Sequence, residues 1–148
     1  MGKYFMTFLL IIAIIISFIV GIYCRIDFMN YPAPKDRISQ EEDIIFKKSY
    51  VKINYDNIEH GTVLDTNSMI PTLDAGHTLL YIEPIKNDIQ VGDIIAWQTE
   101  TSSSLHRLIE IGEDKKGTFY ITQGDANLQK DTKIRFENIK LVVVGIIY

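Results

Sequence analysis

A long apolar stretch near the start of the chain, from Phe5 to Cys24, contains no charged residue. A helix of this length, at ~1.5 Å per residue, reaches ~30 Å, which matches the hydrocarbon core of a bilayer. The apolar core of a cleavable signal peptide is shorter, ~7–15 residues, and ends at a small-x-small site. The residues after Cys24 offer no such site. The pattern therefore predicts an uncleaved N-terminal transmembrane anchor within residues 1–25.

The pattern becomes polar after this stretch. Residues 30–43, with the sequence NYPAPKDRISQEED, contain Pro32 and Pro34 and few apolar side chains. Polar segments interrupted by proline are typical of linkers. We therefore expect a linker over residues 26–43, which holds a folded domain over residues 44–148 away from the membrane.

Short β-type patterns dominate the remainder, and long amphipathic helical periodicity is absent there. The expected strands cover residues 50–55, 78–82, 94–97, 105–111, 118–122 and 141–148. The sequence EDKKG, between two of these strands, predicts a hairpin turn in which Gly117 takes a positive φ. The domain is expected to be mainly β, either a sandwich or a barrel-like sheet.

Charge and composition limit the class of partner and cofactor. The chain carries 15 Lys and Arg against 19 Asp and Glu; without Lys3 and Arg25 of the N-terminal segment, 13 minus 19 leaves −6. An acidic domain argues against nucleic acid as a partner. The single cysteine excludes an internal disulfide framework, and the three histidines are too scattered for a zinc signature. We expect no metal and no other cofactor.

Four polar residues are candidates for catalysis. Ser68 lies in DTNSMIPTL, where Pro71 stiffens the backbone just after the hydroxyl; His106 lies in a predicted strand; Asp125 and Asp131 lie in QGDANLQKD. Each has an ordinary structural explanation when taken singly. A serine is common in turns, a histidine can be half-buried in a strand, and loop aspartates often cap their own backbone.

Together, these residue types predict nucleophilic catalysis. A serine hydroxyl becomes a nucleophile when a neighbouring base takes its proton, and an imidazole suits that role near pH 7. A carboxylate holds the imidazole in the right tautomer. Thr66 lies two residues before Ser68, and residues i and i+2 of a strand share a face, so the two hydroxyls are expected to point together. Thr66 and the Ser68 N–H would then be oxyanion donors.

Four sequences, in the same order, resemble motifs of the signal peptidase I family. They are DTNSMIPTL, VGDIIAW, LHRLIEI and TQGDANLQKD, and they lie between Gly61 and Tyr148. The N-terminal anchor also matches that family. Its common bacterial branch has a lysine where this chain has His106. A second branch, found in archaea, the endoplasmic reticulum and some spore-forming bacteria, has histidine there, so the chain resembles the histidine branch.

The resemblance implies a signal-peptidase-like β-domain in which Ser68 is the nucleophile and His106 the general base. It favours Asp131 as the residue that orients His106, with Asp125 supporting it, and leaves open which of the two is essential. It also implies roles for three residues around the serine. Met69 would line the substrate groove, Pro71 would fix the turn, and Thr66 would assist the oxyanion hole.

The activity implied by the resemblance is that of a membrane-anchored serine endopeptidase that cleaves signal peptides from secreted preproteins. Its partners would be these signal peptides, the bilayer and, as a further candidate, the secretion translocon. The domain would then lie on the extracytoplasmic or lumenal face. The count of basic residues at the ends of the anchor slightly favours the opposite orientation, but that rule is weak for a large domain.

Two other classes of protein compete with this interpretation. Self-cleaving repressors share the serine motif and a related β-fold, but they use a lysine base and carry a DNA-binding region, which His106 and the acidic balance argue against. The main alternative is a catalytically inactive or specialised membrane-tethered β-domain that acts on or binds one particular cargo.

Overall fold

The computed structural model describes residues 11–19, 32–39 and 42–148, and the chain divides into two compact units, Met1–Tyr31 and Pro32–Tyr148. Residues 11–19 of the first unit are α-helical. The predicted transmembrane helix over residues 5–24 lies largely outside the described residues. Within the described ranges, no helix has the length and apolar character needed to cross a bilayer.

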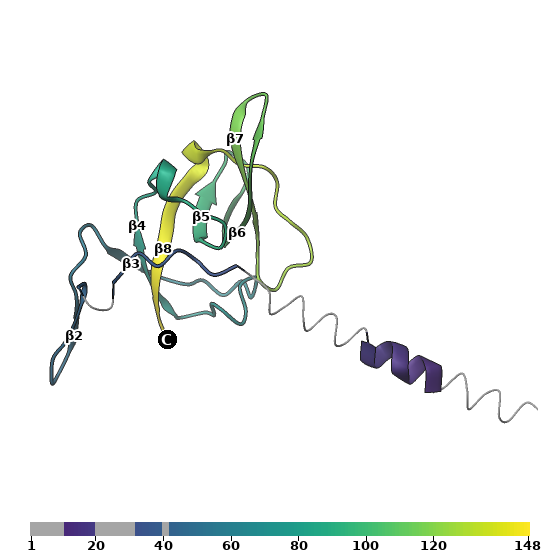
Figure 1. Ribbon diagram of the computed structural model, residues 1–148, viewed down its shortest axis with the longest axis horizontal. Helices are drawn as coiled ribbons and strands as arrows, with labels where there is room; N and C mark the ends of the chain where they lie inside the picture. The colour runs from purple at the N-terminus through teal and green to yellow at the C-terminus, as the bar shows by residue number, and fades with distance from the viewer. Residues whose placement is uncertain (1–10, 20–31, 40–41) are drawn as a thin grey trace, which may run out of the picture. The chain divides into compact units, whose positions relative to one another are not determined.

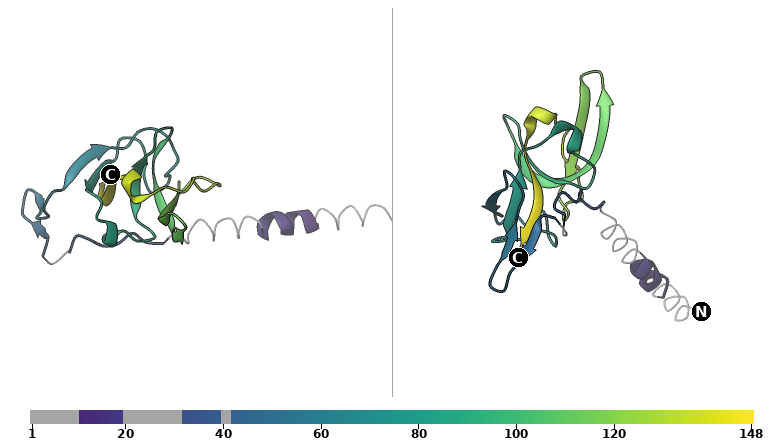
Figure 2. Two further views of the ribbon diagram at one scale, coloured as in Figure 1. Left: turned by 90° about the horizontal axis from the view of Figure 1, so that it is seen from above. Right: turned by 60° about the vertical axis from the view of Figure 1, so that its left-hand side comes forward.

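The second unit is mainly β, which confirms the β character predicted from the alternating pattern (Figures 1 and 2). A six-stranded sheet has the order β3-β4-β8-β5-β6-β7, and every neighbouring pair is antiparallel. A separate two-stranded sheet consists of β1 and β2. The strands are β1 Ile44–Phe46, β2 Val51–Ile53, β3 Glu59–Thr62, β4 Thr78–Ile82, β5 Ile94–Gln98, β6 Ser103–Asp114, β7 Gly117–Gln123 and β8 Ile139–Ile147, and two 3-10 turns cover Lys86–Asp88 and Phe136–Asn138.

All six strands expected from the sequence are present. The strand over residues 78–82 has the expected bounds, the other five have shifted ends, and two further strands were missed. The predicted hairpin joins β6 to β7, with Asp114 paired to Gly117, whose φ of 97° confirms the expected turn. The missed strands are β1 and β3. Strand β3 has the sequence EHGT, which is poor in β-forming residues, and it exists because it pairs with β4 from Tyr81 to Thr78.

Apolar side chains fill both faces of the six-stranded sheet. Ile95 and Val142 belong to one buried cluster, whereas their neighbours Ile94 and Val143 belong to another, because successive side chains of a strand point to opposite faces. Met69, in the loop that carries Ser68, is buried in the second cluster. Burying such a side chain stabilises a fold by about 1.5–3 kcal/mol, so this loop is held against the sheet by its own sequence.

Residues 32–39, which fall within the predicted linker over residues 26–43, belong to the folded unit, whereas residues 26–31, 40 and 41 of that linker lie outside the described residues. The Arg37 side chain is only 3% exposed, and it donates hydrogen bonds to Asp88 at 2.7 Å and to the fully buried Asp93 at 2.7 and 2.8 Å. Asp93 also accepts hydrogen bonds from the backbone N–H groups of Lys35 and Gln90. The segment is therefore fixed by polar contacts, and the pattern of apolar positions along the sequence does not predict such contacts.

Two further features fit this segment to the sheet. Gly92 has a φ of 106°, and a Cβ there would lie 2.1 Å from the carbonyl oxygen of Ala33, so only glycine allows this approach. Burial opposes the charge of Arg37, but hydrogen bonds to Asp93 and Asp88 outweigh it and raise the pKa of the guanidinium. Hydrogen bonds from Lys35 and Arg37 lower the pKa of Asp88.

We predict that Arg37→Ala lowers the free energy of unfolding by about 3–5 kcal/mol, because it leaves the Asp93 carboxylate buried without its partner. Denaturant unfolding of the full chain, followed by circular dichroism, measures the change. The matched control is Lys130→Ala, which removes an exposed ion pair with Glu110 at 3.5 Å and should cost less than about 1 kcal/mol. Equal stability of both variants would contradict the assigned role of Arg37.

Candidate active site

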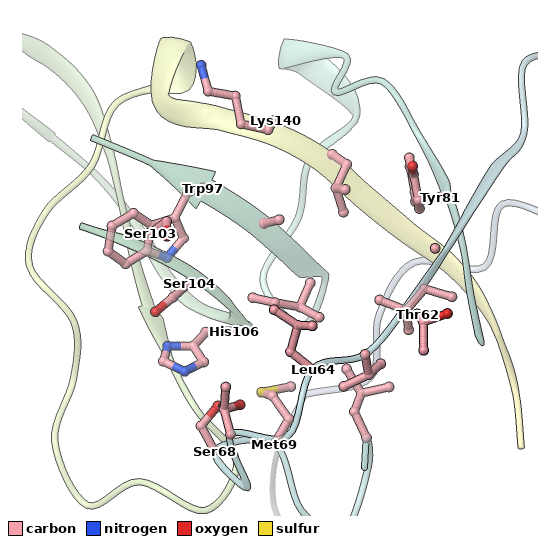
Figure 3. A pocket seen from close by; sticks show the side chains of 18 of the residues that line it. Thr62, Leu64, Ser68, Met69, Tyr81, Trp97, Ser103, Ser104, His106 and Lys140 are labelled. Atoms are coloured by element: carbon pink, nitrogen blue, oxygen red, sulfur yellow. The ribbon is translucent and has the colours of Figure 1, made fainter. Parts of the chain in front are cut away.

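The loop between β3 and β4 carries Ser68 (Figure 3). The expectation that Thr66 and Ser68 lie on a strand is wrong, because β3 ends at Thr62 and Asn67 has a φ of 57°. The two hydroxyl oxygens nevertheless lie 3.2 Å apart. They meet because the chain turns at Asn67, not because the backbone is extended. Two residues after Ser68, the peptide bond before the exposed Pro71 is cis.

Strand β6 carries His106, whose Nδ1 lies 2.6 Å from Oδ2 of Asp131. The same carboxylate oxygen accepts a hydrogen bond from the Thr122 hydroxyl at 2.6 Å, and that hydroxyl in turn accepts one from Trp97 Nε1 at 2.8 Å. The backbone N–H of Asp131 donates to the carbonyl of Thr122. Asp131 is thus held in place by groups from β5 and β7. With Nδ1 engaged in this way, Nε2 is the ring nitrogen left for other chemistry.

Asp125 has a different partner. It accepts two hydrogen bonds from Arg107, from Nε at 2.8 Å and Nη2 at 2.7 Å, and the two side chains are only 1% and 6% exposed. Arg107 follows His106 on β6, so their side chains point to opposite faces of the sheet. Asp125 also accepts a hydrogen bond from the Thr72 hydroxyl at 2.5 Å. The two aspartates therefore contact side chains on different faces of the sheet. Asp131 contacts the histidine, whereas Asp125 contacts Arg107 and, through Thr72, the serine loop.

The loop that follows β7 also contacts the backbone at Ser68. The N–H of Ala126 donates to the carbonyl of Ser68 at 2.9 Å. Gly124 lies so close that a Cβ would come within 2.6 Å of the same carbonyl oxygen. The serine is thus positioned from its carbonyl side by the residues on either side of Asp125, while its hydroxyl faces Thr66.

Ser68 and His106 line one pocket of about 790 Å³ (Figure 3). Thr66 and Met69 also line it, whereas Lys140 stands at the other end (Figure 3). Apolar residues of four strands contribute to its wall, among them Leu79, Tyr81, Ala96, Leu105 and Leu141. The pocket thus combines an apolar wall with the hydroxyl of Ser68 and the imidazole of His106 at one end and the amine of Lys140 at the other (Figure 3).

No hydrogen bond joins Ser68 to His106 in the part of the chain that the structure describes; the serine hydroxyl contacts Thr66 instead. The described residues also contain no group of three or more His, Cys, Asp or Glu side chains that could hold a metal ion. The side chains of Ser68, His106 and Asp131 supply a hydroxyl, an imidazole and a carboxylate at this site.

Sequence reasoning missed Arg107, Thr122 and Trp97, which support the site without forming it. Arg107 could have been noticed, because a charged residue beside a strand histidine must point to the other face and needs a buried partner there. Thr122 and Trp97 gave no signal, since their contact joins residues 25 positions apart.

Comparisons of this chain with protein-family models, with curated proteins and with solved structures found no match. A function can therefore be inferred only from the residues and the geometry of the site.

The two aspartates should differ in their effect on stability. We predict that Asp125→Asn lowers the free energy of unfolding by about 3 kcal/mol, because Arg107 loses the charge that compensates it in a buried site. Asp131→Asn should cost about 1 kcal/mol, since it weakens hydrogen bonds of a partly exposed group. Denaturant unfolding of the two variants tests this, and a larger loss in Asp131→Asn would contradict the division between them.

Proposed function

We propose that this chain is a serine endopeptidase of the signal peptidase I type, in its histidine branch, which is anchored in the membrane and cleaves signal peptides from secreted preproteins. One observation carries the proposal. His106, whose Nδ1 lies 2.6 Å from Asp131, lines the same pocket as Ser68, and the hydroxyl of Ser68 has the Thr66 hydroxyl 3.2 Å away. Three of the four sequence motifs contain these same residues.

In the proposed reaction, Ser68 Oγ attacks the carbonyl carbon of the scissile peptide bond while His106 Nε2 takes its proton. His106 then gives this proton to the leaving amine, and water attacks the resulting ester by the same route. Asp131 keeps Nδ1 protonated and stabilises the imidazolium. The Ser68 hydroxyl has to rotate from Thr66 toward the ring, and catalytic hydrogen bonds are often loose before substrate binds.

The Ser68 N–H and the Thr66 hydroxyl are the proposed oxyanion donors. A donor of this kind typically contributes about 2.7–4 kcal/mol to transition-state stabilisation. Because Ala126 and Gly124 hold the serine carbonyl, the neighbouring N–H has little freedom to move. A fixed donor needs no reorganisation during the reaction, and this is the source of its effect.

The substrate would bind as an extended strand. Strand β3 is the outermost strand of the six-stranded sheet, and its residues Gly61 and Thr62 line the pocket. An edge strand offers backbone groups to an added peptide, whose alternate side chains then enter the pocket. Small side chains before the cut, which are typical of cleavable signal peptides, would fit beside Met69 and Leu79.

Cleavage of a labelled preprotein by the detergent-solubilised full chain tests the proposal. Ser68→Ala and His106→Ala should abolish cleavage, and Asp131→Asn should lower kcat by about 10²–10⁴-fold, because the ring loses its correct tautomer. Thr66→Val should lower kcat by about 10²–10³-fold through loss of one oxyanion donor, whereas Thr66→Ser keeps the hydroxyl and most of the rate.

Two results of this assay would contradict the proposal. Cleavage by Ser68→Ala at the wild-type rate would exclude this serine as the nucleophile. A folded wild-type protein that cleaves no preprotein, and still binds one, would favour the catalytically inactive, membrane-tethered domain instead.

The proposed activity also fixes an orientation, because signal peptides are removed during or after translocation, on the side of the membrane to which the preprotein is exported. We expect the unit Pro32–Tyr148 on the extracytoplasmic or lumenal side. Protease added to intact cells whose surface is open to it should digest this unit, and a cytoplasmic marker protein serves as the control. Protection of the unit to the same degree as the marker would defeat this orientation.

A further inference from the structure

The β1–β2 hairpin presents an apolar face that is largely exposed. The cross-strand pairs Ile44–Ile53 and Phe46–Val51 put four apolar side chains on one face, since paired residues share a side. The first pair is partly buried, whereas Phe46 and Val51, next to the turn, are 74% and 56% exposed. Among the described strands, β1 and β2 pair only with each other (Figure 1). An isolated two-stranded hairpin is marginally stable in water, so a covering surface would stabilise it.

The same hairpin is positively charged. Lys47 and Lys48 lie in the turn and Lys52 lies on the second strand; all three are exposed, and no acidic residue occurs between Ile44 and Ile53. The chain as a whole has a formal charge of −4. The hairpin is therefore a local site of positive charge on an acidic protein, and it combines that charge with an exposed aromatic face.

A second hairpin shows that this combination is not a general property of turns in this protein. The β6–β7 turn also contains two exposed lysines, Lys115 and Lys116. There, Glu113 and Asp114 directly precede the lysines in the sequence, and Asp114 forms ion pairs with Arg135 and Lys133. The β6–β7 turn is thus a matched control for the β1–β2 turn.

We propose that the β1–β2 hairpin docks on an anionic lipid surface. Phe46 and Val51 would enter the interfacial region, and Lys47 and Lys48 would contact the headgroup phosphates. Aromatic and aliphatic side chains on one face, flanked by lysines, are the composition of elements that lie in a membrane interface. The cores of protein–protein interfaces are depleted in lysine, which disfavours a protein as the occupant. The apolar run from Phe5 to Cys24 predicts that the same chain is held at a bilayer.

Docking of the hairpin is independent of the proposed peptidase chemistry, so the test uses the full chain with Ser68→Ala. Phe46→Trp in this background is reconstituted into vesicles of phosphatidylcholine and phosphatidylglycerol that carry brominated acyl chains, which quench tryptophan on contact. The parent chain, with buried Trp97 as its only tryptophan, supplies the background. We expect bromine to quench the added tryptophan about twofold or more, as for a side chain at the acyl boundary. A tryptophan placed by Lys115→Trp should not be quenched.

Electrostatics are tested with paired substitutions. Lys47→Gln with Lys48→Gln should lower the ratio of docked to free hairpin by roughly tenfold or more, because each lysine near an anionic surface contributes to attraction. Lys115→Gln with Lys116→Gln should leave this ratio unchanged. In vesicles of phosphatidylcholine alone, the chain that keeps Lys47 and Lys48 should show bromine quenching as weak as that of the variant with Lys47→Gln and Lys48→Gln.

Several outcomes would overturn the proposal. Equal bromine quenching of the tryptophans at 46 and 115, or quenching that does not depend on anionic lipid, would exclude docking on an anionic surface. Quenching of the tryptophan at 46 by aqueous iodide and not by bromine would show that this face stays in water, and it would overturn docking on lipid. If Phe46→Trp does not fold, Val51→Trp places the same reporter on the same face and decides the question.

Discussion

The buried ion pair between Arg107 and Asp125 is the interaction on which the rest of the site depends. It joins β6 to the loop after β7, and through Thr72 it reaches the loop that carries Ser68. Arg107 directly follows His106 on β6. The ion pair lies on the face of the sheet opposite to the imidazole of His106. From that face it fixes the position of the serine loop relative to the histidine. Because both charges are almost completely buried, neither can be removed without leaving the other uncompensated.

A second ion pair extends this network toward the N-terminal side of the unit. The carbonyl of Gly92 accepts a hydrogen bond from Arg107 at 3.1 Å, and the next residue, Asp93, is held by Arg37. The segment 32–39 is thus linked to the candidate site by contiguous polar contacts.

The two sheets differ in how their apolar side chains are covered. The six-stranded sheet buries apolar residues on both faces and needs no partner to cover its core. The β1–β2 hairpin has one apolar face with few contacts of its own, and its lysines suit an anionic surface. In the proposed function, a substrate lies partly in lipid and partly in the pocket. A hairpin that binds the membrane surface would restrict the distance between the pocket and that surface.

The sequence by itself determined the β character of the second unit, the approximate position of six strands and the hairpin turn at Gly117. These features depend on alternation and turn chemistry, which act over a few neighbouring residues. It also indicated which residue types could meet at a site. Only the tertiary structure decided that Asp131 contacts His106 while Asp125 contacts Arg107, that Thr66 reaches Ser68 through a turn, and that Arg37 holds residues 32–39 against the sheet. The physical reason is that these polar contacts join residues set far apart in the chain or depend on loop dihedral angles, and neither is encoded in a local pattern of apolar positions.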